Sequence, residues 1–357
     1  MDGLEKHRGI FFSYLRSIGK NEKIGIVAHG KCNDGMISSI FLTEILKKLD
    51  YSEKPLLIFA DYGLNVFDEL GEKFKYERIN KVFVLDLCIN PEIAEQFKKF
   101  CSDFNVCYID HHPSDADISF VKNIIKTESA DCTSLDVYKL GNDVLNKKYF
   151  NELLCAAMVS EFSFDKPENL RLLQEYYPDI TKENVRMNSK PFLLSNKIGS
   201  VVLYYKDESL RAFDIVSNME SNEINKIHEI ITDELEKLVN SFNKAESHFG
   251  GRLFFYKIHS RFAIDSMIST ILSTRHTNSA IIVFLDHDKD KSLIKISARF
   301  QAEPLPFLMN DMLKFGINGL ENATAGGHAR ASGATIRKKD IDQFKKQVIS
   351  FVNSGIN

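Results

Sequence analysis

The sequence predicts an α/β protein, with a first domain built on a parallel sheet and a smaller α/β domain joined to it by a helix. Three observations carry this prediction. Apolar, strand-like runs alternate with helical segments up to residue 112, a long amphipathic helix follows later, and a second alternating region begins near residue 250. A chain of 357 residues is also too long for one compact core and suits two domains.

In the first region, short β-branched or aliphatic runs are separated by segments with helical spacing. The predicted strands are residues 23–29, 55–61, 81–87 and 106–112, and the helices between them include residues 36–49 and 91–104. This alternation is typical of βαβ units with helices on the faces of a parallel sheet. Right-handed crossovers place the carboxyl ends of all the strands at one edge, where such sheets bind ligands.

Beyond residue 112 the pattern becomes more helical. Helices are predicted over residues 129–140 and 149–161, whereas residues 165–220, which contain three prolines, are less regular. Apolar residues from Ile224 to Phe242 keep the i, i+3, i+4 spacing of a strong amphipathic helix that ends near residues 250–251.

A second alternating region makes up the C-terminal part. Its predicted strands are residues 252–258, 280–285, 293–300 and 331–336, and its predicted helices are residues 263–274, 305–315 and 340–352. We therefore place a first domain over residues 1–195, a linking region with the amphipathic helix over residues 196–249, and a second domain over residues 250–357.

Composition narrows the classes of function. The net charge of −3 gives no basic excess of the kind that holds long nucleic acids through their phosphates, so a nucleotide ligand is expected to be small. No apolar run approaches the ~18 residues of a membrane span, and the charged N-terminus leads into no signal-like segment. The six cysteines include no C-x-x-C pair, which argues against a structural zinc site. A reduced, cytoplasmic location is the expectation.

The polar residues at the predicted strand ends are the main functional signal. In strand order they are His29, Asp61, Asp86 and the run Asp110-His111-His112. A single Asp at such a place is usually a turn or cap residue, but four strand ends in register are hard to obtain by chance. Imidazole and carboxylate groups bind Mn²⁺ and Zn²⁺. Two such ions can activate water and neutralise both oxygens of an in-line phosphoryl displacement.

Two motifs resemble those of one family. Asp110-His111-His112 resembles the motif that names the DHH phosphoesterases. The run Ala325-Gly326-Gly327-His328-Ala329-Arg330-Ala331-Ser332-Gly333 resembles the G-G-H-x-x-A-x-G loop of the DHH-associated C-terminal domain. The resemblance covers about residues 20–165 and 250–350, and within the family it favours the nanoRNases, which are oligoribonuclease-like.

The resemblance implies a metal site and a catalytic pair. The implied metal ligands are His29, Asp34, Asp86, His111 and, as the last acidic ligand, Glu161, with Asp165 as its alternative. His112 would face the substrate phosphate or leaving group. Asp110 would not bind the metal itself. It would orient one of the metal ligands, and so fix the tautomer and direction of that ligand.

Two positions depart from the family pattern. Cys32 occupies the first Asp position of the D-x-D that many members carry. A thiolate can bind Mn²⁺ but is softer than this ion prefers. Alternatively, Cys32 is only a small apolar residue and one ion is held more weakly. Glu161 stands where the family usually has Asp, so whether one or two ions bind stays open.

The C-terminal motif implies a phosphate-binding site. Its glycines let the backbone approach a ligand closely and turn amide groups towards an anion. Its histidine and arginine add donors, and arginine suits bidentate phosphate contact. A further arginine lies where the family usually has a substrate-binding one. The implied substrate-binding residues are Arg299, Gly326, Gly327, His328, Arg330 and Ser332.

We therefore expect a phosphodiesterase that uses Mn²⁺, with two ions and with Mg²⁺ or Co²⁺ as substitutes, and that hydrolyses very short oligonucleotides to 5′-mononucleotides. The alternatives are a 3′,5′-bisphosphonucleotide phosphatase, a cyclic-dinucleotide phosphodiesterase, and a nucleotide-binding sensor that has lost catalysis. RecJ-like exonucleases share the motifs, but their chains are longer and carry extra DNA-binding domains. The expected partner is a short oligonucleotide or small phosphorylated nucleotide and not a membrane. The sequence leaves open the base preference, the choice between RNA and DNA, the polarity of cleavage and whether the chain forms a homodimer.

Overall fold

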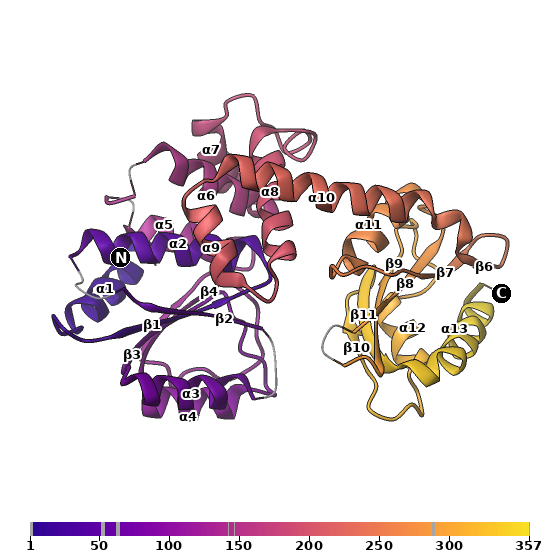
Figure 1. The fold of residues 1–357 in the computed structure, drawn as a ribbon, viewed down its shortest axis with the longest axis horizontal. Helices are drawn as coiled ribbons and strands as arrows, with labels where there is room; N and C mark the ends of the chain where they lie inside the picture. Colours follow the sequence, from indigo (N-terminus) through magenta and orange to yellow (C-terminus); the bar gives the residue numbers. More distant parts are fainter. Residues whose placement is uncertain are drawn as a thin grey trace. The chain divides into compact units, whose positions relative to one another are not determined.

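The computed structural model describes residues 3–50, 54–61, 65–141, 143–145, 147–287 and 290–356. The chain divides into two compact units, Met1–His228 and Glu229–Asn357, and each has its own sheet (Figure 1). Helix α10 (Ser221–Asn240) crosses the division in the sequence. The predicted α/β class, with a parallel sheet in the first part and a second α/β part, is confirmed.

The first unit is built on a five-stranded sheet with the order β2-β1-β3-β4-β5, and all neighbouring strands are parallel. The strands are β1 (Ile24–His29), β2 (Leu56–Ala60), β3 (Lys81–Leu85), β4 (Asn105–Asp110) and β5 (Asn123–Lys126). The strand order reverses at β1 and β3, and the crevice at such a point is where these sheets bind ligands. The sequence did not predict β5, because four residues at a sheet edge give too short a pattern.

Helices cover both faces of this sheet (Figure 1). They are α3 (Val66–Glu77) and α4 (Ala94–Asp103) on one face, and α1 (Gly3–Arg16), α2 (Asn33–Lys48) and α5 (Thr133–Gly141) on the other. Alternate residues of β1 divide accordingly, since Val27 enters the core under α3 and α4 while Ile26 and Ala28 join the core under α2. A strand buried on both faces needs the continuous apolar run that β3 shows.

Most of the region predicted to be less regular, residues 165–220, is helical, and only residues 177–189 fit that prediction. The helices that follow α5 are α6 (Lys148–Ser160), α7 (Pro167–Tyr176), α8 (Lys190–Tyr204) and α9 (Ser209–Ser217). Pro167 and Pro191 lie in the first turns of α7 and α8, where a missing N–H removes no helical hydrogen bond. The buried Asn33 of α2 donates from Nδ2 to the Ser195 carbonyl at 2.9 Å and so ties α8 to the first turn of α2.

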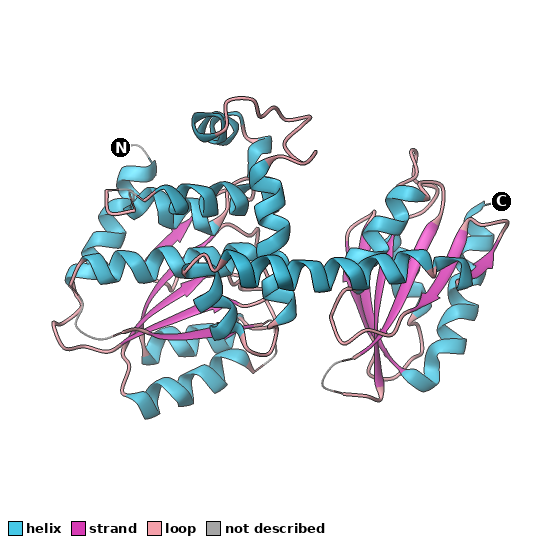
Figure 2. Ribbon diagram, turned by 45° about the horizontal axis from the view of Figure 1, so that its top comes forward, coloured by secondary structure: helices cyan, strands magenta, loops and turns pink. Residues whose placement is uncertain are grey.

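The second unit contains a six-stranded mixed sheet with the order β10-β11-β9-β8-β7-β6 (Figure 2). Its elements are β6 (Glu246–His248), β7 (Leu253–Lys257), α11 (Asp265–Arg275), β8 (Ala280–Asp286), β9 (Leu293–Arg299), α12 (Met309–Gly316), β10 (Thr324–Gly327), β11 (Ala331–Arg337) and α13 (Ile341–Ile356). Met312 of α12 and Phe344 of α13 share an apolar core with Ile296 of β9. The neighbouring Ser297 bonds through its hydroxyl to Ser269 of α11 at 2.9 Å, so α11 covers the other face.

The Gly-Gly-His segment forms a β-hairpin, in which the predicted strand over residues 331–336 is confirmed as β11 and residues 324–327, for which no strand was predicted, form β10. β10 and β11 are antiparallel, with Gly326 opposite Gly333 and Gly327 opposite Ser332. Gly327 has a φ of 134°, and a Cβ there would lie 2.6 Å from the Ala331 carbonyl, so only glycine fits. A Cβ on Gly326 would meet no atom within 4 Å, which leaves its backbone open to a ligand. Across both units, no helix of the described residues is long and apolar enough to cross a membrane.

Candidate metal centre and phosphate pocket

Asp86 lies at the centre of the polar cluster at the carboxyl edge of the parallel sheet. It follows β3 directly, is 1% exposed, and has a φ of 55°, which is unusual for a residue other than glycine. Its N–H donates to the Ile109 carbonyl of β4 at 3.1 Å, so the neighbouring strand holds the turn. Strained backbone of this kind persists where the surroundings over-determine it, and it is frequent at functional sites.

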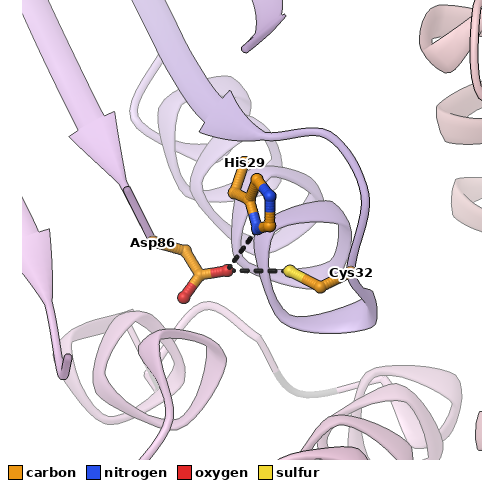
Figure 3. A group of neighbouring side chains, drawn as sticks. All are labelled: His29, Cys32 and Asp86. Carbon is orange, nitrogen blue, oxygen red and sulfur yellow. Dashed lines mark hydrogen bonds and ion pairs between the residues drawn. The ribbon is translucent and has the colours of Figure 1, made fainter. Parts of the chain in front are cut away.

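The two carboxylate oxygens of Asp86 face two different groups of side chains. Oδ2 accepts a hydrogen bond from the Cys32 thiol at 2.9 Å and lies 3.9 Å from His29 Nδ1 (Figure 3). Oδ1 lies 3.6 Å from His111 Nε2 and 3.8 Å from His112 Nδ1. In each group of three, one ligand atom per residue can be chosen so that all lie within 4.8 Å of one another. Asp86 therefore belongs to two groups of side chains, each of which could hold a metal ion.

Asp34 comes from the first turn of α2 and is fixed by the start of α5. Its two oxygens accept the backbone N–H groups of Thr133 and Ser134, each at 2.7 Å. Oδ2 also lies 3.7 Å from His111 Nε2. The Thr133 hydroxyl in turn donates to Asp86 Oδ1 at 3.2 Å. The sequence carries no sign of the roles of Thr133 and Ser134, because backbone amides leave no signature in residue type.

His112 is held by the carboxylate that precedes it. Asp110 Oδ1 accepts from His112 Nδ1 at 2.8 Å, which in the neutral ring leaves Nε2 as the acceptor nitrogen. The Lys126 ammonium, at the end of β5, bonds to both Asp110 Oδ2 and the His112 carbonyl. Burial alone would raise the pKa of Asp110, but the contacts with His112 and Lys126 outweigh it and lower that pKa. Lys126 was also missed, because its strand was not predicted.

The pKa shifts within the cluster indicate that its buried carboxylates would be stabilised by positive charge. Burial and the charges of Asp86 and Glu161 raise the pKa of Asp34 well above its ordinary value. Burial and Asp86 also raise the pKa of Glu161. Burial would lower the pKa of His111, but Asp86, Asp34 and Asp110 raise it to about 9. These buried, mutually repelling carboxylates are of the kind that a divalent cation would neutralise.

The buried imidazole of His111 gives a direct test of whether a metal fits. Neither of its ring nitrogens has a hydrogen-bond partner among the described residues, and the contacts of Nε2 with Asp34 and Asp86 are too long to be hydrogen bonds. A buried polar atom without a partner is costly unless a ligand or water engages it. Imidazole nitrogen and carboxylate oxygen are donors that Mn²⁺ accepts, so the residues present fit a divalent ion.

Glu161 and Asp165, the two alternatives for the last acidic ligand, lie in different environments. Glu161 follows α6, and its charge acts on Asp34, Asp86 and the cluster histidines. Asp165 is exposed and pairs with Lys182 at 2.8 Å. The electrostatic influence of Glu161 on the cluster, and the exposure of Asp165, therefore favour Glu161. Asp61, at the end of the neighbouring strand β2, pairs with Lys31 and lies 3.9 Å from His29 Nε2.

A prediction concerns Asp136 of α5, whose carboxylate accepts the Thr127 hydroxyl at 2.7 Å. Burial raises the pKa of Asp136 from 3.8 to about 7. Between these pH values the folded chain holds a proton that the unfolded chain has lost, so stability falls as pH rises. Asp136→Asn removes this penalty. We expect the variant to be more stable than wild type at pH 8, by up to about 4 kcal/mol at 1.36 kcal/mol per pKa unit, with a smaller difference at pH 5 in chemical denaturation.

Asp131 supplies the opposite control for that experiment. Burial would raise its pKa, but hydrogen bonds from Asn169 and Lys166, both at 3.0 Å, lower it. Its contribution is present above the ordinary carboxyl pKa and lost as pH falls. Asp131→Asn should therefore lose stability at pH 8. A destabilising effect of Asp136→Asn at pH 8 would contradict the prediction.

The second unit holds a pocket of about 550 Å³ beside the hairpin. Of the predicted substrate-binding residues, Arg299, Gly326, Gly327, His328 and Ser332 line it. Arg299 donates to the Ala298 carbonyl and to the Ser266 hydroxyl, both at 2.9 Å, which fixes its guanidinium. Lys295 and Asp265 also line the pocket, and no motif in the sequence marks either of them.

Arg330 lies apart from this pocket. It sits at the tip of the hairpin, where its guanidinium donates to the Ala302 carbonyl at 3.0 Å and pairs with Glu303. It is not among the residues that line the pocket. In the sequence, Arg299 and Arg330 are equally good candidates for binding substrate. In the structure, their guanidinium groups contact different partners.

Comparisons with known proteins identify a domain at the C-terminal end of the chain and structures that share its fold. Residues 253–354 match the DHHA1 domain family. A comparison with curated proteins finds no match. Exonuclease RecJ bound to manganese has a TM-score of 0.68 and 12% identity, over 97% of this chain and 94% of that chain.

Two further solved structures share the fold. RecJ from Thermus thermophilus in complex with Mn²⁺ has a TM-score of 0.65 and 14% identity, over 99% of this chain but only 55% of that chain. A DHH domain described as a member of the S1p family of ribosomal proteins has a TM-score of 0.65 and 14% identity, over 99% of this chain and 92% of that chain. Residues 253–354 are therefore a DHHA1 domain, and the chain as a whole shares the fold of RecJ and of the DHH domain structure.

Proposed function

We propose that this chain is a divalent-metal-dependent phosphodiesterase that hydrolyses very short oligonucleotides to 5′-mononucleotides. The observation that carries the proposal is the Asp86 carboxylate, whose two oxygens face two separate groups of metal-capable side chains. A shared carboxylate of this kind is what a two-ion phosphoryl-transfer site needs. RecJ, whose fold the chain shares, has been solved with Mn²⁺ and with Mg²⁺, which supports a divalent ion here.

The proposed ligands are drawn from both groups. They are His29, Cys32 and Asp86 for one position, and Asp86, His111 and Asp34 for the other, with Glu161 beside them. When bound, the ions would activate water and offset the charge that develops on the phosphoryl oxygens. Asp34 holds its orientation through the amides at the start of α5, so the acidic side of the site is fixed before substrate arrives.

His112 is proposed to act at the phosphate or leaving group. Asp110 fixes its ring through Nδ1, and Lys126 fixes both the carboxylate and the His112 carbonyl. The side chain is 30% exposed, against 6% for His111, so it is the more accessible of the adjacent histidines. A partly exposed imidazole with a set tautomer can exchange a proton with a substrate oxygen.

The preference for short substrates rests on charge and on pocket size. The net charge of −3 gives no general attraction for a long polyanion. The pocket of about 550 Å³ in the second unit is of the size that holds one small ligand. The length of the chain does not separate it from RecJ, because 94% of one RecJ chain is covered.

The test is an assay with Mn²⁺ over a substrate panel, resolved by chromatography. The panel contains linear dinucleotides, longer RNA and DNA, a 3′,5′-bisphosphonucleotide and a cyclic dinucleotide. We expect dinucleotides to be turned over much faster than the other substrates, and His111→Ala to remove that turnover. Comparable rates on dinucleotides and long single strands would overturn the short-substrate preference. A single weakly bound ion with no turnover would favour a nucleotide-binding sensor.

A further prediction separates the two arginines of the second unit. Arg299→Ala should raise the KM for a dinucleotide by about 10- to 100-fold, the range expected from losing a charged hydrogen bond worth about 1.5–3 kcal/mol, and should lower kcat less. Arg330→Ala should leave KM within about threefold of wild type, because Arg330 does not line the pocket and pairs with Glu303. Steady-state kinetics measure both. An equal rise in KM for the two variants would contradict the assignment of Arg299 as the phosphate-gripping arginine.

A further inference from the structure

We infer that the two positions of the metal centre differ in ion preference, and that the position formed by His29, Cys32 and Asp86 selects a thiolate-preferring ion of the Zn²⁺ class over Mn²⁺. The inference rests on the metal centre of the proposed function and goes beyond it by assigning a specific ion class to one half. The other position, formed by Asp86, His111 and Asp34, offers only nitrogen and oxygen donors.

The backbone aims the Cys32 sulfur into the centre. Cys32 is the N-cap of α2, with extended backbone angles, and its Sγ accepts the Gly35 N–H at 3.2 Å. The same sulfur lies 2.9 Å from Asp86 Oδ2, and the ligand atoms of Cys32, Asp86 and His29 lie within 4.8 Å of one another (Figure 3). With metal–ligand distances of about 2.0–2.3 Å for Zn²⁺, one ion can reach all three atoms.

Comparison with the other cysteines argues against a merely apolar role for Cys32. Cys107, Cys132 and Cys155 are buried within the apolar core cluster of the first unit. Cys32 is outside that cluster, and its sulfur contacts a buried carboxylate and a backbone amide instead. Burial and the charges of Asp86 and Glu161 raise the pKa of the Cys32 thiol well above its ordinary value, so a bound metal ion would have to displace the thiol proton.

The chemistry of the donors separates the two positions. A thiolate carries the same charge as the carboxylate of an aspartate, so the total charge of the centre is unchanged and only the softness of one donor differs. Sulfur and imidazole together suit Zn²⁺, whereas oxygen-rich sites suit Mn²⁺ and Mg²⁺. Three ligands of the N, S and O type also leave a coordination position open, as catalytic zinc sites do.

The test uses the metal-free full chain titrated with Co²⁺, whose bond to a thiolate gives a sulfur-to-cobalt charge-transfer band in the near ultraviolet. We expect the band in wild type and in His111→Ala, and we expect Cys32→Ser to lack it. Cys88→Ser is the matched control, because Cys88, like Cys32, is partly exposed. Cys88 lies after β3, and its Sγ contacts the Pro113 carbonyl and not the metal centre. That variant should keep the band.

Cys32→Asp tests the selectivity itself. Aspartate is also a favoured N-cap, so the variant should fold, as circular dichroism would show. In competition titrations, we expect it to lose at least about 100-fold in Zn²⁺ affinity, the upper end of what removing even a supporting group of a metal site costs, and to gain affinity for Mn²⁺. An unchanged ratio of Zn²⁺ to Mn²⁺ affinity would overturn the inference.

The outcomes also separate this inference from the proposed function. Binding of Co²⁺ to wild type without the charge-transfer band would reject the thiolate position while leaving a metal-dependent phosphodiesterase intact. Failure of wild type to bind any of the three ions would reject the metal centre, and with it the proposed function. Loss of the band in Cys88→Ser as well as in Cys32→Ser would contradict the assignment of the metal-binding sulfur to Cys32.

Discussion

Asp86→Asn is expected to abolish high-affinity binding of both ions and to lower phosphodiesterase activity by at least about 10³-fold. Removing one electrostatic stabiliser of a transition state typically costs about 10²–10³-fold, and Asp86 serves both halves of the centre. Its Oδ2 faces Cys32 and its Oδ1 faces His111, so no other side chain in the cluster takes the same position. Metal content after dialysis, isothermal titration with Mn²⁺ and a dinucleotide assay measure the three losses.

The variant should nevertheless fold. Asparagine tolerates the left-handed backbone of position 86 better than most residues, and its side-chain oxygen can still accept the Thr133 hydroxyl. The charge of Asp86 also raises the pKa of Asp34 and of Glu161, so its removal relieves repulsion among carboxylates. We therefore expect the metal-free variant to be at least as stable as metal-free wild type, but to gain no stability when Mn²⁺ is added.

Asp61→Asn is the control for that experiment. Asp61 also follows a strand at the same sheet edge, but its side chain is 46% exposed and pairs with Lys31. Its loss should change Mn²⁺ affinity much less than the loss of Asp86. Two ions bound to Asp86→Asn at wild-type affinity would show that the carboxylate does not bridge.

The position of the centre follows from topology that the sequence reveals. In a parallel sheet, residues that end different strands must meet at one edge, and so His29, Asp86 and Asp110 could be predicted to lie together from strand patterns alone. The family resemblance then separated the adjacent histidines into two expected roles. The structure adds that Asp110 and Lys126 hold the second of them.

Other parts of the site could not be predicted from residue types. Thr133 and Ser134 act on Asp34 through backbone amides, which every residue except proline possesses. The different surroundings of Arg299 and Arg330 depend on a hairpin whose pairing places one beside the pocket and the other at the tip. Such directions come from register and tertiary packing, which short motifs do not encode.

Gly35→Ala is expected to destabilise the first unit by about 3 kcal/mol or more, the upper range of overpacking in a close-packed core. A Cβ on Gly35 would lie 2.1 Å from the His29 carbonyl oxygen and 2.9 Å from its carbonyl carbon. Both are backbone atoms of the end of β1, so no side-chain rotation can relieve the clash. The first turn of α2 would have to move away from the strand.

That movement would also reach the metal centre, because β1 supplies His29 while the start of α2 supplies Cys32 and Asp34. We therefore expect Gly35→Ala to weaken Mn²⁺ binding together with stability, as measured by titration and by thermal unfolding with and without the ion. Gly9→Ala is the matched control, because Gly9 lies within α1 and a Cβ there meets no atom within 4 Å. It should gain up to about 1 kcal/mol from helix propensity. A Gly35→Ala protein that unfolds and binds Mn²⁺ like wild type would mean that the contact between α2 and β1 does not set the geometry of the site.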